Sequence, residues 1–506
     1  MGASSHKRDP FKTHFVAGAI VATLAAVALA ACSSGSEDQA ASLGYPNGDR
    51  ANTRSGGGAI DSQTVSDLEP AWTLPAVSNG AVGAFASSPV VVNGVVYAQD
   101  LDSGVWAVDL DSGDVRWRTR FQSPTVGPNG VFVSADRVYG ATAEEGFALD
   151  RDTGKKIWST RLVGDPSERI AMAPGYSKGL VYLSTVPKYF DGGERGTLWA
   201  LDAETGRRLW SFSTVPKDLW GDPKVNDGGG LTHPPAFDDQ GSMYFGVGSP
   251  DPLPGTKRQP WGSSRPGPNL YTDSVVKLDA RTGRLQWYYQ LTPHAICVWD
   301  LDQSPLLLSA GGRDLVIAAG KAGIVVALDR RTGKPVWRQP VGIHNGHDRD
   351  GLRLMRNGYR GPDLPMTVFP GSSGGVTASL STNGSTVFVP LINHSTTLYS
   401  QKLVGQSVST VGEIVALDAA TGRIRWQHQL GASTYGATSA VNDLVFATTV
   451  DGTVYALDAD SGKSEWQLNL PASIAGIEGG LGFGDDTLVV PAGLSEEPSL
   501  VAYRLD

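Results

Sequence analysis

The residues best suited to chemistry by type and spacing lie in a short loop, His344-Asn345-Gly346-His347-Asp348-Arg349-Asp350. The loop holds His344, His347, Asp348 and Asp350, and imidazole and carboxylate groups are ligands that a transition metal accepts. The same side chains can instead hydrogen-bond to one another and close a turn. Because a fourth ligand and its geometry do not follow from the sequence, we favour the turn and keep metal binding as the alternative.

Other reactive patterns are missing from the sequence, and this narrows the chemistry. No glycine-rich phosphate loop, Ser-His-Asp arrangement or zinc-ligand spacing stands out. The cysteines are Cys32 and Cys297, so a chain processed at Cys32 has no structural disulfide, and no Cys-x-x-Cys-His sequence attaches a haem. Cys297 lies in an apolar run, so we expect it to be buried. The net charge of −9 argues against nucleic acid or an anionic membrane surface as a partner.

A repeated motif supplies the elements that must position any site. It consists of a short apolar run, Asp, two residues, Thr or Ser, Gly, three residues and Trp. Seven copies occur, at Val105–Trp117, Gly146–Trp158, Leu198–Trp210, Val275–Trp287, Val325–Trp337, Ile414–Trp426 and Val454–Trp466. Self-similarity at a period of roughly 40–50 residues is typical of a propeller or a solenoid.

Each copy has the features of a β-hairpin. In the last copy, Val454–Leu457 predicts a buried strand, and Asp458 can accept hydrogen bonds from backbone N–H groups two or three residues further on. Gly462 supplies the positive φ of the turn, and Trp466 offers a large ring for packing between neighbouring units. Because one hairpin unit cannot bury both of its faces, we expect equivalent units to stack around an axis.

An eighth copy is divided between the chain ends. Leu500–Asp506 matches the first half of the motif, and Leu68–Trp72 resembles the second half. Joining them would close the ring and remove exposed sheet edges. The sequence therefore predicts an all-β fold, a single eight-bladed β-propeller closed by pairing of the N- and C-terminal strands. A seven-bladed ring with a stray terminal strand is the alternative.

The first 31 residues have the features of a secretion signal. Three basic residues precede an unbroken run of apolar and small residues, Phe15–Ala31. Leu29–Cys32 resembles the lipobox of bacterial lipoproteins, in which the cysteine is lipidated. We expect a lipoprotein signal peptide at 1–31, lipidation at Cys32, a polar linker at 32–45 and the propeller at 46–506. The alternative is an uncleaved membrane anchor, because the run is just long enough to span a bilayer. Both interpretations place the propeller outside the cytoplasmic membrane.

The repeats and several segments between them resemble one family, over about residues 46–506. The most specific segments are Arg265–Ser274 (RPGPNLYTDS), Tyr289–His294 (YQLTPH), Gly320–Gly323 (GKAG) and the entry segment Asn52–Ser55 (NTRS). They resemble the PQQ-repeat propellers of the quinoprotein alcohol dehydrogenase-like superfamily, which includes methanol, ethanol and polyvinyl alcohol dehydrogenases. The repeat alone also occurs in propellers without enzymatic activity, among them outer-membrane assembly lipoproteins.

The resemblance implies a set of cofactor and metal contacts. Lys321 stands where the family has a cation that contacts the quinone, His233 where it has an aromatic floor, and Asn393 where it has an amide near the quinone. Asp191 and Ser249 stand where the family has the Glu and Asn ligands of Ca²⁺. A flat quinone with three carboxylates needs such cations, and Ca²⁺ needs oxygen ligands.

The position of the catalytic base is where the sequence departs from the family. In the ungapped alignment of His294–Asp302, Val298 occupies the place of the base and Asp300 that of the second aspartate. A shift of two residues instead makes Asp300 the base. Because valine cannot accept a proton, Asp300 or Asp302 must substitute for it in the ungapped register. We take Asp300 as the catalytic residue and leave Asp302 as the alternative.

Two functions follow as hypotheses. The first is a lipid-anchored envelope dehydrogenase that oxidises an alcohol or a sugar with PQQ and Ca²⁺ and passes electrons to a separate acceptor. The second is a propeller lipoprotein without catalysis that binds a protein or a glycan in the envelope. The motif does not choose between them, because its residues close turns and pack blades.

Overall fold

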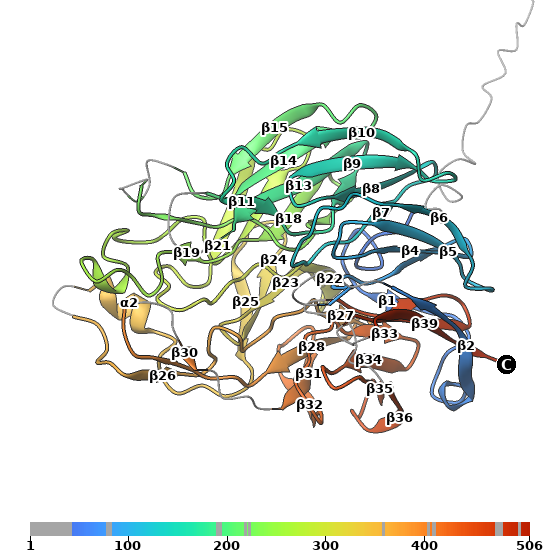
Figure 1. The fold of residues 1–506 in the computed structure, drawn as a ribbon. Helices are drawn as coiled ribbons and strands as arrows, with labels where there is room; N and C mark the ends of the chain where they lie inside the picture. The colour runs from blue at the N-terminus through green and yellow to red at the C-terminus, as the bar shows by residue number, and fades with distance from the viewer. Residues whose placement is uncertain are drawn as a thin grey trace, which may run out of the picture. The chain divides into compact units, whose positions relative to one another are not determined.

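Each motif copy forms the outer two strands of an antiparallel sheet, and eight such sheets are arranged around an axis as the blades of a propeller (Figure 1). The structure is a computed structural model. It describes residues 43–76, 83–188, 195–216, 220, 224–356, 360–401, 405–406, 411–470, 479–493 and 497–506. All of these belong to one compact unit, Ser42–Asp506. The described residues confirm the prediction of an eight-bladed all-β propeller.

Blades 1 to 4 follow one another along the chain. Their strands are β3 (Val90–Val92), β4 (Val95–Gln99), β5 (Val105–Asp109) and β6 (Val115–Thr119); β7 (Phe132–Val133), β8 (Arg137–Ala141), β9 (Glu145–Asp150) and β10 (Lys156–Arg161); β11 (Glu168–Ile170), β12 (Gly175–Ser177), β13 (Leu180–Pro187), β14 (Thr197–Asp202) and β15 (Arg208–Ser213); and β17 (Ala236–Phe237), β18 (Ser242–Gly246), β20 (Ser274–Asp279) and β21 (Leu285–Gln290).

Blades 5 to 7 repeat this arrangement. Their strands are β22 (Leu306–Ala310), β23 (Arg313–Gly320), β24 (Ile324–Asp329) and β25 (Pro335–Pro340); β27 (Ser381–Thr382), β28 (Thr386–Ile392), β31 (Gly412–Asp418) and β32 (Ile424–Gln429); and β33 (Ser439–Val441), β34 (Leu444–Thr448), β35 (Thr453–Asp458) and β36 (Ser464–Asn469).

Blade 8 contains both ends of the propeller sequence. It consists of β2 (Leu68–Pro75), β39 (Ser499–Leu505), β38 (Thr487–Ala492) and β37 (Gly482–Phe483). β2 and β39 pair antiparallel from Leu68 opposite Leu505 to Pro75 opposite Ser499. This pairing is the ring closure that the two half-motifs predict.

Smaller elements join the blades. They are β1 (Ser55–Gly56), which pairs with β33; β16 (Asp227–Gly228) with β19 (Pro250–Asp251); β26 (Met366–Val368) with β29 (Thr396–Leu398) and β30 (Gly405–Gln406); the helix α2 (Asp350–Leu354); and the 3-10 turns η1 (Val65–Asp67) and η2 (Pro260–Gly262). Within the described residues, no helix has the length and apolar character needed to cross a membrane.

The motif residues close turns and hold adjacent blades together. Asp458 accepts the backbone N–H of Ser461 at 2.7 Å, and Gly462 at φ 72° donates its N–H to the Asp458 carbonyl at 2.8 Å. A Cβ on Gly462 would lie 2.4 Å from the indole of Trp426 in the preceding blade. The same tryptophan-on-glycine contact recurs in the pairs Trp72–Gly113, Trp117–Gly154, Trp158–Gly206, Trp210–Gly283, Trp287–Gly333 and Trp337–Gly422.

Residues 44–59, here called the N-terminal belt, run across the innermost strands of successive blades. Gly44 pairs with Val133 in blade 2, and Tyr45 packs edge-on against Phe132. Four belt carbonyls then accept one inner-strand N–H each from blades 4, 5, 6 and 7, in the pairs Phe237–Arg50, Leu307–Ala51, Thr382–Thr53 and Ala440–Arg54. The belt therefore fixes the inner strands of these blades relative to one another.

Candidate active site

A pocket of about 250 Å³ lies among the loops that enter blades 2 to 5. Its walls come from segments far apart in the sequence, and they carry Arg169, Thr232, Ser249, Asp251, Asp300, Asp302 and Lys321, with the glycine run 228–230 beside them. This volume is slightly below the roughly 300–1,000 Å³ of typical ligand pockets. The pocket holds three of the residues that the family resemblance singles out.

Asp300 and Lys321 form the central ion pair. Lys321 Nζ lies 2.7 Å from Asp300 Oδ2, and the Lys321 backbone N–H donates to the Asp300 carbonyl at 2.9 Å. The other carboxylate oxygen, Oδ1, accepts the backbone N–H of Ser249 at 2.7 Å. Gly320 permits this approach, because a Cβ there would lie 2.1 Å from the Asp300 carbonyl oxygen. Glycine at position 320 therefore lets the backbone of Lys321 reach Asp300.

The charge environment of Asp300 favours its ionised form. Burial raises the pKa of Asp300. The Lys321 ammonium and the hydrogen bonds from Lys321 and Ser249 together lower it by more than burial raises it, so the pKa lies below its ordinary value. Asp300 is thus a carboxylate at neutral pH, as a proton acceptor must be.

Asp302 lies beside Asp300 and titrates differently. Its Oδ2 accepts the Thr232 hydroxyl at 2.5 Å. Burial, and then the Asp300 carboxylate, raise the pKa of Asp302 to about 6. Two neighbouring carboxyls with pKa values pushed apart are a common arrangement in acid–base sites.

His233 lies behind Asp302. Its Nδ1 is 3.1 Å from the Asp302 carbonyl oxygen and 2.9 Å from the Thr232 hydroxyl. Burial lowers the pKa of His233 to about 3, so the ring is neutral. The aromatic-floor role of His233 stays a prediction.

Asp273 is a third buried carboxyl next to this group, and the sequence reasoning missed it. Its Oδ1 accepts the Ser249 hydroxyl at 3.0 Å, while no hydrogen bond to Oδ2 is found among the described residues. Burial, reinforced by Asp300, raises the pKa of Asp273 well above its ordinary value. Ser249 therefore links two aspartates, with its N–H on Asp300 and its hydroxyl on Asp273.

The segment Arg265–Ser274 explains how Asp273 is placed. Arg265 is fully buried, hydrogen-bonds to the Asn269 amide oxygen, and donates to the carbonyls of Pro252 and Ala295 at 3.2 and 2.8 Å. This closes the loop before β20. The match of this segment to the family was the signal that could have pointed to Asp273.

The remaining predicted residues lie elsewhere or outside the described chain. Val298 is buried in a small apolar cluster with Leu253 and Ala295, so its side chain offers no acid–base group. The Asn393 amide oxygen accepts the Ile343 N–H at 2.9 Å, and its Nδ2 donates to Glu413 at 3.2 Å. Asp191 and Cys32 lie outside the described residues, and their roles stay predictions.

The histidine loop forms pairs of hydrogen bonds. His344 Nδ1 lies 2.8 Å from Asp348, and His347 Nδ1 lies 2.6 Å from Asp350. Within the described part of the chain, no group of three or more His, Cys, Asp or Glu side chains is arranged to hold a metal. The turn interpretation accounts for these contacts. Cys297 is buried, as expected, and burial raises the pKa of its thiol to about 12.

Family profiles match most of the sequence. A profile described as "Outer membrane protein assembly factor BamB" matches residues 33–135, 125–221 and 366–502, nearly two thirds of the chain. A second, described as "Glucose/ethanol/alcohol dehydrogenase, beta-propeller domain", matches 193–341, where the pocket residues are concentrated. The chain belongs to the PQQ-repeat β-propellers of the quinoprotein alcohol dehydrogenase family.

Several relatives of this PQQ-repeat propeller are dehydrogenases by name. A quinohemoprotein alcohol dehydrogenase of Comamonas testosteroni is 32% identical over 357 residues, which are 62% of this chain and 49% of that protein. A putative dehydrogenase XoxF of Paracoccus denitrificans is 28% identical, covering 83% of this chain and 81% of the other. The chain spans about half the length of the quinohemoprotein relatives.

Solved structures agree on the fold of the PQQ-repeat propeller. The quinohemoprotein alcohol dehydrogenase ADHIIG of Pseudomonas putida HK5 matches with a TM-score of 0.78 at 23% identity, over 91% of this chain and 79% of that chain. A europium-containing methanol dehydrogenase matches with 0.76 at 20% identity, over 91% and 97%. BamB from Moraxella catarrhalis matches with 0.55 at 14% identity, over 86% and 99%.

Proposed function

We propose that this protein is a quinone-dependent dehydrogenase that oxidises a small alcohol or sugar in the pocket around Asp300. The observation that carries the proposal is the ionised Asp300 carboxylate, paired with Lys321 at 2.7 Å inside a pocket that has room for a ligand. The dehydrogenase names of the sequence relatives support the reaction class.

Residues that line the pocket, together with Asp273 buried behind Ser249, fit the group that such relatives use. Lys321 and Arg169 give two cations on the pocket wall for a quinone that carries three carboxylates. Asp273 Oδ2, buried and without a hydrogen bond among the described residues, offers an oxygen for a hard cation beside Ser249. PQQ, with Ca²⁺ or a lanthanide such as the europium of one relative, is the cofactor set that we propose. When bound, the quinone would accept the hydride that leaves the alcohol carbon.

The chain's own residues then handle the proton. Asp300 lies on the pocket wall as a carboxylate and can accept the proton of the alcohol hydroxyl. Lys321 holds the Asp300 side chain in place and keeps it ionised. Asp302, which faces the same pocket, is the alternative proton acceptor above its pKa of about 6.

The cellular setting is part of the proposal. The signal-like first 31 residues and Cys32 support a lipid anchor outside the cytoplasmic membrane. Because the sequence contains no Cys-x-x-Cys-His haem attachment, we propose that electrons leave to a separate acceptor.

Reconstitution tests the proposal. The purified protein is incubated with PQQ and either Ca²⁺ or Eu³⁺, and reduction of an artificial dye is followed with primary alcohols and sugars. We expect bound quinone absorbance and alcohol-dependent dye reduction in the wild type. Lys321→Met should lose both, whereas Asp300→Asn should keep the quinone and lose the dye reduction. If no quinone is retained and no dye is reduced with either metal, the enzyme proposal is wrong.

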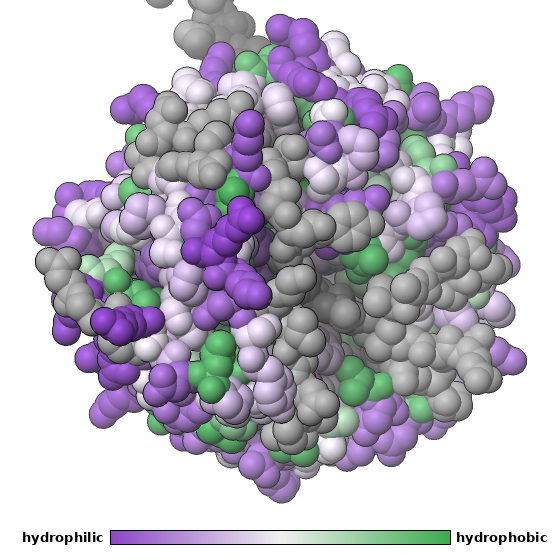
Figure 2. All heavy atoms as spheres, turned by 60° about the vertical axis from the view of Figure 1, so that its left-hand side comes forward, coloured by the Kyte–Doolittle hydropathy of each residue, from purple (hydrophilic) through white to green (hydrophobic). Residues whose placement is uncertain are grey.

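A binding scaffold is the second candidate, because the BamB profile covers more of the chain than the dehydrogenase profile does. On the face seen in Figure 2, hydrophobic side chains lie in small separate areas, without one continuous patch among the described residues. A scaffold would retain an envelope protein in a pull-down irrespective of PQQ, and Asp300→Asn would leave that binding unchanged.

A further inference from the structure

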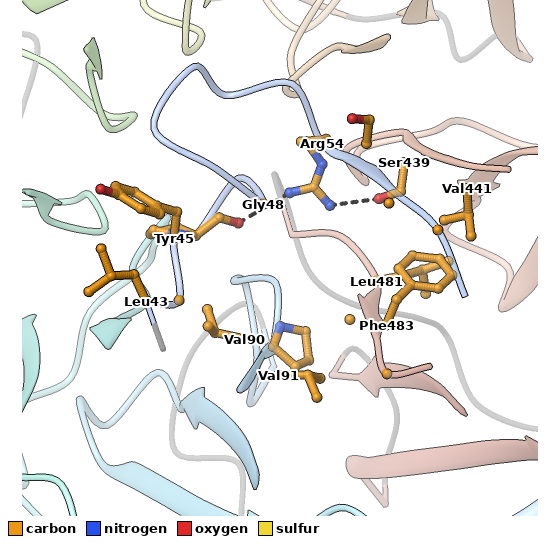
Figure 3. Close-up of a pocket in the computed structure, with 18 residues that line it drawn as sticks. Leu43, Tyr45, Gly48, Arg54, Val90, Val91, Ser439, Val441, Leu481 and Phe483 are labelled. Carbon is orange, nitrogen blue, oxygen red and sulfur yellow. Dashed lines mark hydrogen bonds between the residues drawn. The ribbon is translucent and has the colours of Figure 1, made fainter. Parts of the chain in front are cut away.

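A second pocket, of about 230 Å³, lies where the N-terminal belt meets blades 7, 8 and 1 (Figure 3). The residues that line it are all different from those around Asp300. The belt gives one wall, and the inner strands β33, β37 and β3 give the others. The dehydrogenase proposal makes no use of this pocket.

A buried guanidinium lies in the wall of this pocket. Arg54 is 6% exposed, and Figure 3 shows its guanidinium between the belt turn at Gly48 and Ser439. Nε donates to the Thr438 carbonyl at 2.7 Å, Nη2 donates to the Ser439 hydroxyl at 3.0 Å, and Nη1 contacts oxygens of Pro46, Asn47 and Ser88 at 3.1–3.3 Å.

Every one of these acceptors is neutral. Burial lowers the pKa of Arg54 to about 10, and the group stays positively charged at neutral pH. Among the described residues, no acidic side chain forms an ion pair with Arg54, and one of the two N–H groups of Nη2 has no acceptor. A buried charge without a counterion is costly, and a neutral amide could supply similar hydrogen bonds without that cost. The local hydrogen bonds therefore do not explain why this position carries a positive charge.

Arg54 lines the pocket. Gly480 packs against Nη2 on another side, where a Cβ would lie only 2.4 Å from this nitrogen, so glycine at this position leaves room for the guanidinium. The rest of the pocket wall is mixed: Leu43, Val90, Val441 and Phe483 give apolar surface, and serines and glycine backbone give polar surface. A charged donor group beside these apolar side chains matches a small anion with a short apolar body.

We propose that this pocket binds a small organic carboxylate, with the carboxylate on Arg54 and the apolar part against the walls from the belt, blade 1 and blade 8. Guanidinium groups pair with carboxylates through charge-assisted hydrogen bonds of matching planar geometry. The site is separate from the Asp300 pocket, and the proposal holds whether or not the protein is a dehydrogenase.

Calorimetry with hexanoate and benzoate on the full-length protein tests the site. The neutral analogues hexanamide and benzamide measure how much of the binding depends on charge. We expect saturable binding of at least one carboxylate and at least tenfold weaker binding of its amide. No carboxylate binding to the wild type, or equal binding of acid and amide, overturns the proposal.

Two variants keep the test independent of folding. Gly56 lines the pocket, and a Cβ added to it would meet only Val441, at 4.0 Å, so Gly56→Leu adds bulk at the pocket wall from a position with room for its Cβ. We expect this variant to melt like the wild type and to bind the carboxylate at least tenfold more weakly. The matched control is Gly164→Leu, which adds the same side chain at an open site outside the pocket and leaves the affinity unchanged. Unchanged affinity in Gly56→Leu overturns the proposal.

A third variant tests whether a carboxylate of the protein itself is the counterion of Arg54. Glu478 stands two positions before Gly480 in the sequence, outside the described residues. We expect Glu478→Gln to bind hexanoate as the wild type does. Binding that occurs only in Glu478→Gln would show that Glu478 is the counterion of Arg54 and would overturn the proposal.

Discussion

At the scale of single residues, the Asp300 pocket depends on charges that are buried together. Asp273, Asp300 and Asp302 lie near one another, with Lys321 paired to Asp300. Lys321 opposes the effect of burial on Asp300, while Asp302 and Asp273 have raised pKa values because burial and the Asp300 charge act together. The ion pair and the pKa difference can each be tested by one substitution.

The first prediction concerns the ion pair. Lys321→Met leaves the Asp300 carboxylate buried without its ammonium, so we expect the pKa of Asp300 to rise and the free energy of unfolding to fall by about 3 kcal/mol. Denaturant titration at pH 7 measures the loss. The control is Lys463→Met, which removes a pair in which Lys463 is 73% exposed and should change little. Equal losses in the two variants would contradict the prediction.

The second prediction concerns pH. The pKa of Asp302 is about 6 in the folded protein and roughly 3.9 in the unfolded chain. The folded state therefore binds more protons between about pH 4 and 6, and its stability falls as the pH rises through this window. In Asp302→Asn this part of the fall should disappear from unfolding curves measured without cofactor.

Asp418 provides a control of opposite sign. Its hydrogen bond from Arg425 lowers the pKa of Asp418 to about 2, so its contribution is present above about pH 4 and is lost as the pH falls toward 2. Asp418→Asn should leave the slope between pH 4 and 6 as in the wild type. If Asp302→Asn also leaves that slope unchanged, Asp302 is not the group that titrates there.

At the scale of elements, one glycine in the repeated hairpin meets two requirements: a positive φ for the turn and room for the tryptophan of the neighbouring blade. Gly462 has a positive φ of 72°, and the indole of Trp426 lies where its side chain would be. The turn therefore fixes the chain direction within a blade and also docks that blade on its neighbour. This explains why the motif needs both its glycine and its tryptophan.

A pair of glycine substitutions separates the two effects. Gly462→Ala adds backbone strain and a clash with Trp426, so we expect a loss of about 2–4 kcal/mol in unfolding free energy. Gly94→Ala has a similar φ of 71° but nothing within 4 Å of the new methyl, so we expect only about 1 kcal/mol. Thermal and denaturant unfolding measure both. A loss in Gly94→Ala as large as that in Gly462→Ala would argue against the indole contact as a cause.

At the scale of the whole molecule, closure depends on pairing between the two ends of the propeller sequence. β2 pairs with β39 over its full length, and Trp72 packs on Gly113 in blade 1. The belt adds a second connection, because its carbonyls accept hydrogen bonds from the inner strands of four blades. The ring is thus held at its inner strands by the belt and closed at its first and last strands by blade 8.

Truncation tests the closure. Removing residues 499–506 deletes β39 and exposes the edges of β2 and β38, so we expect a lower melting temperature and association into larger species. Size-exclusion chromatography and thermal melting measure these effects. Removing Asp506 alone, which lies beyond β39, should leave both properties unchanged. A truncated protein that elutes and melts like the wild type would show that blade 8 is dispensable.

The sequence by itself determined the architecture, because each motif copy carries its own turn, strand and docking residues. Asp458 and Gly462 act through neighbours within a few positions, and Trp426 acts through the adjacent copy, so these residues recur as a pattern along the sequence. The split eighth blade was predictable for the same reason, since each half kept its part of the pattern.

Only the tertiary structure decided which residues share the pocket. Ser249, Asp300 and Lys321 line the pocket, and Asp273 is buried beside Ser249. They come from separate loops of blades 4 and 5, and their contacts depend on how those loops fold against one another. Spacing along the chain does not show such contacts. The same is true of Arg54, whose lack of an acidic partner among the described residues is seen only once its neighbours are in place. The fold could thus be predicted from the sequence because it rests on local interactions. The chemistry of the pocket could not, because it depends on which charged groups are buried together in three dimensions.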